Sequence, residues 1–247
     1  MTAIEPAQRT AAKVAGAWYL IAMVAGIFAE IYVRSRLIVP GDVMQTARNI
    51  TASEWLFRIG TVTNLIVFAG DVVLLVALYV ILRPVNRNIA LLAVAWRIID
   101  SGILAVNLLS DFAILRLLSG ADYLRVFDAK QLAALARLFY GVEAAGYQIG
   151  FVFLGLGSAV YSYLWLKSRY IPKAIAVLGI FASLVMAFVT LAIMLFPSLS
   201  VIGLTYMAPM FFYEVGLGLW LLFKGIRMPI TASDSPAPDN RQPPGPA

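Results

Sequence analysis

IGTVTNLIVFAGDVVLLVALYVIL, residues 59–82, is an unbroken apolar stretch that contains one charged side chain, Asp71. A helix needs about 20 mostly apolar residues to cross the hydrocarbon core of a bilayer. Arg83 and Pro84 follow at once, and proline disfavours helix both at its own position and at the residue before it. The stretch therefore predicts a membrane-spanning helix that ends at the proline.

Five further stretches have the same character. The six predicted spans are 14–33, 59–82, 88–115, 144–166, 174–196 and 203–223. Hydrophobic residues make up 62% of the 247 residues and charged residues 13%, whereas soluble domains carry about 25% charged residues. We therefore expect an all-α fold, a polytopic transmembrane bundle of six helices with short interfacial helices in the outer loops.

The remaining sequence predicts three regions. Residues 1–12 form a short cytoplasmic head, 13–228 the six-helix transmembrane domain, and 229–247 a disordered, Pro-rich cytoplasmic tail, because the tail has too few apolar residues to offset its chain entropy. The first apolar run is long for a signal peptide, so we expect it to be retained as a helix.

The basic residues predict the orientation. Short cytoplasmic loops of membrane proteins are enriched in Lys and Arg. One set of span ends carries nine basic residues on short connections: Arg9, Lys13, Arg83, Arg87, Lys167, Arg169, Lys173, Lys224 and Arg227. The other side carries its basic residues on longer loops. We therefore expect these short connections, and both termini, to lie in the cytoplasm.

Two residue types are absent, which excludes several kinds of chemistry. The chain has no Cys and no His, so it lacks thiolate ligands, Ser-His-Asp triads and HExxH zinc sites. No metal site and no cofactor is expected. The net charge of +6 lies mostly at span ends, where Lys and Arg meet anionic lipid, so we expect a lipid bilayer and no nucleic acid as partner.

Four charged residues fall near the middle of the predicted spans. Asp71, Arg97, Asp100 and Glu214 each lie about 15–20 Å along a helix from the nearest basic span end. A charge at this depth costs at least about 2.5 kcal/mol on insertion scales, so such residues face protein or water. This set is the candidate intramembrane polar site.

A second group of polar residues lies on the same helices or near them. Arg97, Asp100, Asn107 and Asp111 share one face of the third span at 100° per residue. The secondary polar stripe that we predict comprises Asn64, Asn107, Asp111, Glu143, Tyr147 and Gln148. Separately, Glu30 and Arg34 have the i,i+4 spacing of an ion pair and are predicted to pair at the outer interface.

Two interpretations of the buried charges remain open. They could hold the bundle in register as structural ion pairs, or they could line a pathway or binding pocket. The acids outnumber Arg97 at its depth, whereas a single pair would suffice for a structural role. An excess of acids suits the handling of protons or cations.

Small and aromatic residues receive structural roles. Gly150, Gly155 and Gly157 in the fourth span, and Gly216 and Gly218 in the sixth, predict close approach of helices. The tryptophans, including Trp18 and Trp165, are interpreted as interface anchors or lipid-facing residues without chemistry.

Several longer strings resemble a known family. They are RSRLIVPGD (34–42), ASEWLFRIG (52–60), ALYVILRPVN (77–86), GYQIGFVFLGLG (146–157) and SRYIPKAIAVLG (168–179). Together they are similar to a bacterial integral-membrane family known as domain of unknown function 4386, over about residues 10–227. The resemblance implies a multi-pass helical membrane protein and no particular activity.

Three classes of function compete. The first is a small-solute or ion-coupled transporter that uses the midplane charges, for which a homodimer would compensate for the small size of the chain. The second is a sensor, scaffold or assembly subunit whose buried charges are structural and whose outer loops bind a partner. An intramembrane enzyme with paired carboxylates is the least favoured.

Overall fold

The computed structural model describes residues 5–203 and 205–227, and within them the chain is helical with no strand. The predicted tail at 229–247 lies outside the described residues. The elements are α1 (Pro6–Gly26), η1 (Ile27–Val33), α2 (Arg34–Leu37), α3 (Val43–Ala52), α4 (Glu54–Leu82), α5 (Arg87–Asn107), α6 (Leu109–Leu117), η2 (Asp122–Val126), α7 (Ala129–Ser168), α8 (Lys173–Leu195), η3 (Pro197–Ile202), η4 (Thr205–Met207) and α9 (Ala208–Phe223).

Six helical segments of the described chain are long and apolar enough to cross a membrane, which confirms the predicted fold class. They are Pro6–Leu37, Glu54–Leu82, Arg87–Leu117, Ala129–Ser168, Lys173–Leu195 and Thr205–Phe223. The first begins at Pro6, so the described part of the predicted head already belongs to the first helix. The helices stop where the sequence predicts, since α4 ends just before Pro84 and α8 just before Pro197.

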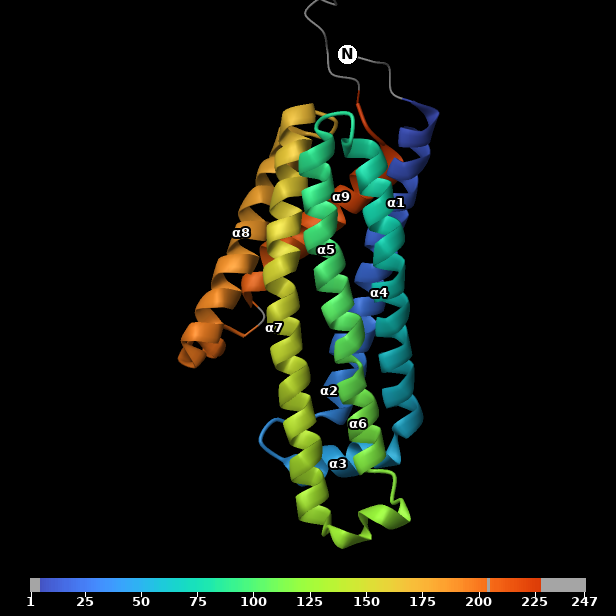
Figure 1. Cartoon of the computed structure of the whole chain (residues 1–247), viewed down its shortest axis with the longest axis vertical. Helices are drawn as coiled ribbons and strands as arrows, with labels where there is room; N and C mark the ends of the chain where they lie inside the picture. Colours follow the sequence, from blue (N-terminus) through green and yellow to red (C-terminus); the bar gives the residue numbers. More distant parts are fainter. Residues whose placement is uncertain (1–4, 204, 228–247) are drawn as a thin grey trace, which may run out of the picture.

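The six spanning segments form a closed ring in chain order. Each helix packs against the next one in the order α1, α4, α5, α7, α8 and α9, and α9 packs back against α1. The path alternates down and up, so α1 begins and α9 ends at the same end of the bundle, which we call the terminal end (Figure 1). The opposite end is the distal end.

The distal end extends beyond the rest of the bundle. The helix α7 runs through 40 residues without a break, about 60 Å at 1.5 Å per residue. Its first half therefore continues the fourth span along the same axis. The helix α8 ends well before the distal tips of α6 and α7, and α3 crosses the distal end beside α4 and α7 (Figure 1). Asp42 caps α3 by accepting a 2.8 Å hydrogen bond from the Gln45 amide, as its sequence position predicts.

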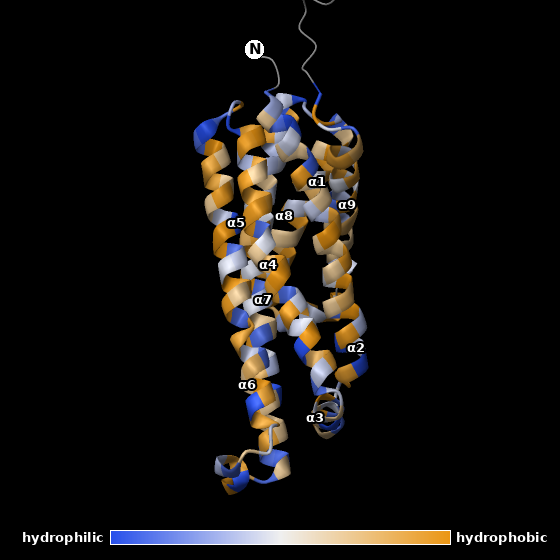
Figure 2. Cartoon of the chain, turned by 90° about the vertical axis from the view of Figure 1, so that its right-hand side faces the viewer, coloured by the Kyte–Doolittle hydropathy of each residue, from blue (hydrophilic) through white to orange (hydrophobic). Residues whose placement is uncertain are grey.

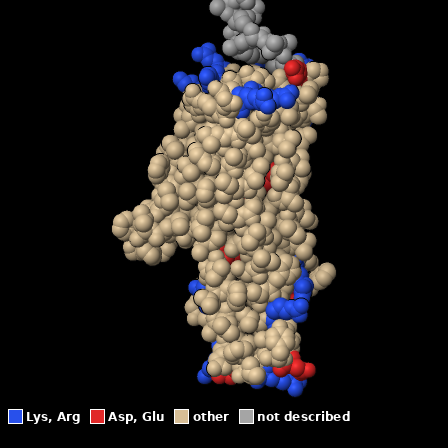
Figure 3. All heavy atoms as spheres, in the orientation of Figure 1, with Lys and Arg blue, Asp and Glu red and all other residues tan. Residues whose placement is uncertain are grey.

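The surface agrees with a membrane location. Apolar residues make up most of the helices, with hydrophilic residues at both ends and at some positions between them (Figure 2). On the face shown in Figure 3, Lys and Arg side chains gather at the terminal end and reappear with acidic residues toward the distal end, separated by a broad band almost free of charge. Side chains such as Trp165, Tyr161 and Tyr213 fill the interior of the terminal half. The location of Trp165 inside the bundle corrects its interpretation as an interface anchor.

Glycines set how closely the helices pack. A Cβ atom at Gly155 would lie 2.6 Å from the Ser183 carbonyl oxygen and 2.8 Å from the Ala187 amide nitrogen, so α7 and α8 touch backbone to backbone there. Gly157 lies against the Arg97 side chain, and Gly218 against Tyr19. The prediction for Gly216 is wrong, because nothing lies within 4 Å of a Cβ atom at that position.

Gly155 and Gly216 give a matched test of helix packing. We expect Gly155→Ala to lower the free energy of unfolding by about 1–3 kcal/mol, because the methyl group overlaps the α8 backbone. Gly216→Ala should be neutral or stabilising by about 0.5–1 kcal/mol, because alanine is the better helix former. Thermal unfolding of both variants in detergent checks this, and equal behaviour would contradict the close α7–α8 contact.

Candidate functional site

Two of the spanning segments are irregular at the same level of the bundle. The first span changes from α-helix to the π-helix η1 at Ile27, and Glu30 lies inside η1. The third span is interrupted at Leu108, between α5 and α6, with Asn107 and Asp111 on either side. Short π-helical segments are rare and often lie at functional sites, so these two irregularities direct attention to the side chains between them.

Those side chains form an ion cluster around Arg34. Its Nε atom lies 2.9 Å from a Glu30 carboxylate oxygen. Its Nη1 donates a 2.9 Å hydrogen bond to Glu143, and Nη2 donates to the second Glu143 oxygen. Nη2 also lies 3.7 Å from Asp111. We call Glu30, Arg34, Asp111 and Glu143 the distal cluster.

Uncharged side chains from three helices complete the distal cluster. Asn64 of α4 donates a 2.7 Å hydrogen bond to Glu30, and the Tyr147 hydroxyl of α7 donates one of 3.0 Å to the same oxygen. Thr61 donates to Asp111 at 2.8 Å. The Asn107 amide donates to the main-chain carbonyl of Glu143 at 2.7 Å. The cluster therefore ties together four of the six spanning segments.

The distal cluster carries more negative than positive charge. Glu30, Asp111 and Glu143 surround one guanidinium, and Asp111 and Glu143 are each 1% exposed. One buried oxygen of Asp111 has no hydrogen-bond partner among the described residues. An ion pair that only held helices together would need one acid, so two carboxylates are in excess.

A cavity of about 360 Å³ opens beside the distal cluster. Its lining includes Glu30, Arg34, Glu143 and Tyr147. It also includes Ile193 near the end of α8 and residues of the connection to α9, such as Ser200 and Tyr206. Gln148, predicted as part of the polar stripe, lines this cavity as well. We call this space the distal cavity.

The four midplane residues lie deeper, and we call them the central cluster. Arg97 Nη1 is 3.2 Å from Asp100, one helical turn away on α5, and both residues are buried. Within the described residues Arg97 makes no ion pair within 4 Å with Asp71 or Glu214. Asp71 accepts a 3.3 Å hydrogen bond from the Trp18 indole of α1. The central cluster therefore has the composition of the distal cluster, three acids and one arginine, but only Asp100 is paired with its arginine.

Hydrogen bonding in the central cluster is incomplete. Three buried atoms make no hydrogen bond among the described residues: Arg97 Nη1, Asp100 Oδ1 and Ser101 Oγ. The 3.2 Å contact between Arg97 Nη1 and Asp100 is thus an ion pair without a hydrogen bond. Buried polar groups without partners are rare in native proteins, because each costs about 1–3 kcal/mol. The ion pair between Arg97 and Asp100 is therefore poorly satisfied as a purely structural contact.

The structure regroups the predicted site residues. Five members of the secondary stripe, Asn64, Asn107, Asp111, Glu143 and Tyr147, converge on the Glu30–Arg34 pair, which the sequence presented as a separate feature. Sequence reasoning missed Thr61 and Trp18. Trp18 lies inside the first span, which was the available signal for it, and the structure places its ring against Gly70 of α4.

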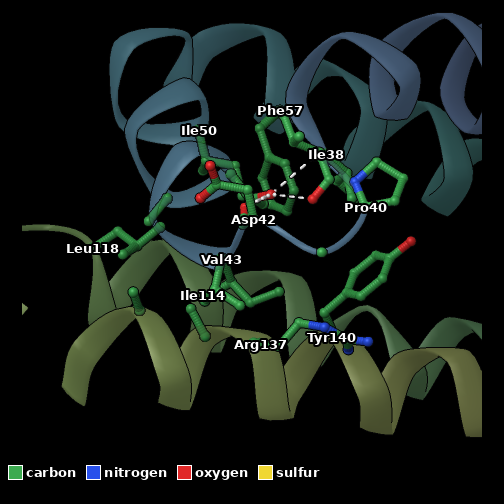
Figure 4. A pocket seen from close by; sticks show the side chains of 16 residues that line it. Ile38, Pro40, Asp42, Val43, Ile50, Phe57, Ile114, Leu118, Arg137 and Tyr140 are labelled. Atoms are coloured by element: carbon green, nitrogen blue, oxygen red, sulfur yellow. Dashed lines mark hydrogen bonds between the residues drawn. The ribbon is translucent and has the colours of Figure 1, made fainter. Parts of the chain in front are cut away.

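A second pocket lies at the distal end, in the region of α3 and the first half of α7 that we call the distal cap. It has a volume of about 310 Å³ and lies between the 38–43 loop, α3, α6 and α7. Phe57 and Ile114 contribute apolar lining, and Arg137 and Tyr140 approach from α7 (Figure 4). Tyr140 also lines the distal cavity, and Arg34 and Arg137 lie 5.7 and 5.3 Å from its ring centre. Its ring therefore separates the cap pocket from the distal cavity.

Six apolar helices that enclose two buried charge clusters define a multi-pass integral membrane protein. The chain belongs to the family described as Domain of unknown function (DUF4386), whose model matches residues 14–225. This match confirms the family resemblance of the sequence strings. No curated protein and no solved structure matches the chain.

Proposed function

We propose that this protein is a coupled carrier that moves a small solute across the membrane together with, or in exchange for, a proton or another cation. The observation that carries the proposal is the excess of acids over arginine in the distal and central clusters. Each cluster contains three acids and one arginine, so two carboxylates in each exceed what Arg34 or Arg97 needs as an ion-pair partner. Carboxylates held in a bilayer at such cost are typical of ion and proton pathways.

The two clusters follow one another along the same helices. Asn64 and Asp71 are seven residues apart on α4, and Asp100 and Asn107 are seven apart on α5, a separation of about 10 Å in each case. A cation that enters the distal cavity would therefore meet the distal cluster first and the central cluster two turns deeper. The irregular backbone at η1 and Leu108 lies beside the distal cluster.

For the location, we propose a bacterial cytoplasmic membrane with the terminal end in the cytoplasm. The concentration of Lys and Arg on the short connections at that end supports this orientation. The distal cap, including α3 and the first half of α7, would then lie on the outer side.

A sensor or scaffold is the second candidate, and the distal cap favours it. The cap extends beyond the end of α8 and holds its own pocket, which a carrier does not require. In that case the buried charges would be structural. A stoichiometric protein partner that co-purifies with the full chain would favour this candidate over a carrier.

Flux in proteoliposomes tests the carrier. A pH-sensitive dye inside the vesicles reports proton movement when membrane-impermeant solutes are added outside: quaternary ammonium ions, amino acids, sugars, Na⁺ and K⁺. We expect at least one class of solute to drive a pH change, and Asp100→Asn to slow it at least tenfold. Glu54→Gln, which alters an exposed ion pair with Arg58, is the matched control and should leave the rate unchanged.

Two results would contradict the carrier. One is the absence of any signal above protein-free vesicles for the whole panel with folded protein. The other is an equal loss of rate in the Asp100 and Glu54 variants, since the loss would then have no connection with the buried clusters.

A further inference from the structure

The residues that line the distal cavity are of two kinds. Glu30, Arg34 and Glu143 are charged, whereas Phe151, Ile193, Tyr206 and Met207 are apolar or aromatic, and we call the second set the aromatic wall. Ligand cavities commonly have volumes of about 300–1,000 Å³, so a space of about 360 Å³ suits a small ligand. A ligand that satisfies both kinds of residue has a charged group and an apolar body.

The exposed charge in this cavity is negative. The Glu30 side chain is 37% exposed, compared with 14% for Arg34 and 2% for Glu143. All three guanidinium nitrogens of Arg34 already face carboxylates. Arg34 therefore has no free pair of N–H groups with which to bind an anion. The Glu30 oxygens also have partners, Arg34, Asn64 and Tyr147, but the Glu30 side chain lines the cavity and remains the more exposed of the two.

Aromatic rings lie close to this carboxylate. Tyr147 donates its hydroxyl to Glu30, and its ring lies 5.7 Å from that of Phe151. Tyr206 lines the same cavity, and so does Tyr140, whose ring already lies beside the guanidinium groups of Arg34 and Arg137. A cavity lined by an exposed carboxylate and by aromatic residues suits an alkylammonium group, because the carboxylate attracts the cation and aromatic rings both attract it and cover its methyl groups. A compact, strongly hydrated metal ion would leave the aromatic wall without a partner.

We propose that the distal cavity binds a small monovalent organic ammonium ion, with its charged nitrogen at Glu30 and its alkyl groups against the aromatic wall. The assignment rests on the proposed function in taking the distal cavity as the place where the solute enters. The ammonium group has two sources, a free amine in solution or the headgroup of a lipid in the adjacent leaflet. Both present the same chemistry to Glu30.

Equilibrium binding tests the proposal without requiring transport. Choline is titrated calorimetrically into the full chain in lipid-free detergent, alongside 3,3-dimethyl-1-butanol, its neutral isostere. We expect choline to bind at least tenfold more tightly than the isostere. Glu30→Gln should abolish this preference, and Ala144→Phe, which fills the cavity and leaves the charges intact, should weaken binding at least tenfold. Glu54→Gln serves as the control and should bind as the wild type does.

A lipid arm distinguishes the two sources. The chain is placed in nanodiscs of phosphatidylglycerol with or without phosphatidylethanolamine, and its thermal stability is measured. Stabilisation by phosphatidylethanolamine that Glu30→Gln removes, with no binding of free choline, assigns the site to a lipid headgroup and supports ammonium recognition.

Two outcomes overturn the assignment. One is measurable binding of choline and its isostere with equal affinity, or choline binding that survives both Glu30→Gln and Ala144→Phe. The other is that Glu30→Gln changes neither the binding of choline nor the stabilisation by phosphatidylethanolamine, including the case in which neither is detected with the wild type. Binding without flux would leave this site standing and remove the carrier, whereas flux of another solute without ammonium binding would do the reverse.

Discussion

Replacing Arg34 with glutamine is expected to lower the free energy of unfolding by about 3–5 kcal/mol, the usual cost of removing one partner from a buried ion pair. The side chain neutralises part of the charge of Glu30, Asp111 and Glu143. Glutamine leaves these three carboxylates close together with no cation between them. It also removes the contacts that join the first span to α6 and α7.

Thermal unfolding in detergent, followed by intrinsic fluorescence, measures the effect. Arg58→Gln is the matched control, because Arg58 pairs with Glu54 at an exposed site where such pairs contribute about 0–1 kcal/mol. Adding Glu143→Gln to Arg34→Gln should recover part of the loss. If Arg34→Gln is no more damaging than Arg58→Gln, the distal cluster does not hold the helices together.

Replacing Arg97 with glutamine is the second change with a large expected effect, again about 3–5 kcal/mol. It leaves the buried Asp100 without its ion-pair partner and removes the one arginine of the central cluster. The double variant Arg97→Gln/Asp100→Asn should be more stable than Arg97→Gln alone, because it removes one of the stranded charges. Thermal unfolding of the two variants beside the wild type measures both effects.

The single neutralisations of acids then separate structure from function. If Asp71→Asn or Glu214→Gln leaves the protein as stable as the wild type or more so, these acids are held at a cost to folding, as expected of functional groups. If each of them destabilises the protein as much as Arg97→Gln does, the central cluster is a structural network. The carrier proposal would then lose its main support.

Hydropathy and proline positions were sufficient to predict the six spans, because crossing a bilayer requires a length of apolar helix that few other structures need. The exceptions lie where tertiary contacts override local pattern. The interval from Ile27 to Val33 is a mostly apolar part of a long apolar run, so the π-helix, which packs beside α4, has no signal in the sequence. The interruption at Leu108 likewise has no adjacent proline or glycine that would predict it.

The candidate site was predictable in parts. The i,i+4 spacing predicted the pair of Glu30 and Arg34, and helical periodicity predicted one polar face on the third span. Periodicity specifies the face of a helix and does not specify the helix that it meets. The contact between Arg34 and Glu143, 109 residues apart, therefore came only from the structure. The same limit explains why Trp18 was not matched with Asp71.

Two of the helices around the distal cluster are continuous, and two are interrupted there. Within the described chain, α4 and α7 pass the cluster without interruption, whereas the first and third spans each have a joint there, at η1 and Leu108. A displacement of the cap would be transmitted along α7, which would pivot about its backbone contact with α8 at Gly155 and Ser183. The two jointed helices would absorb the movement by bending, so ion contacts around Arg34 would open and close without unpacking the terminal half.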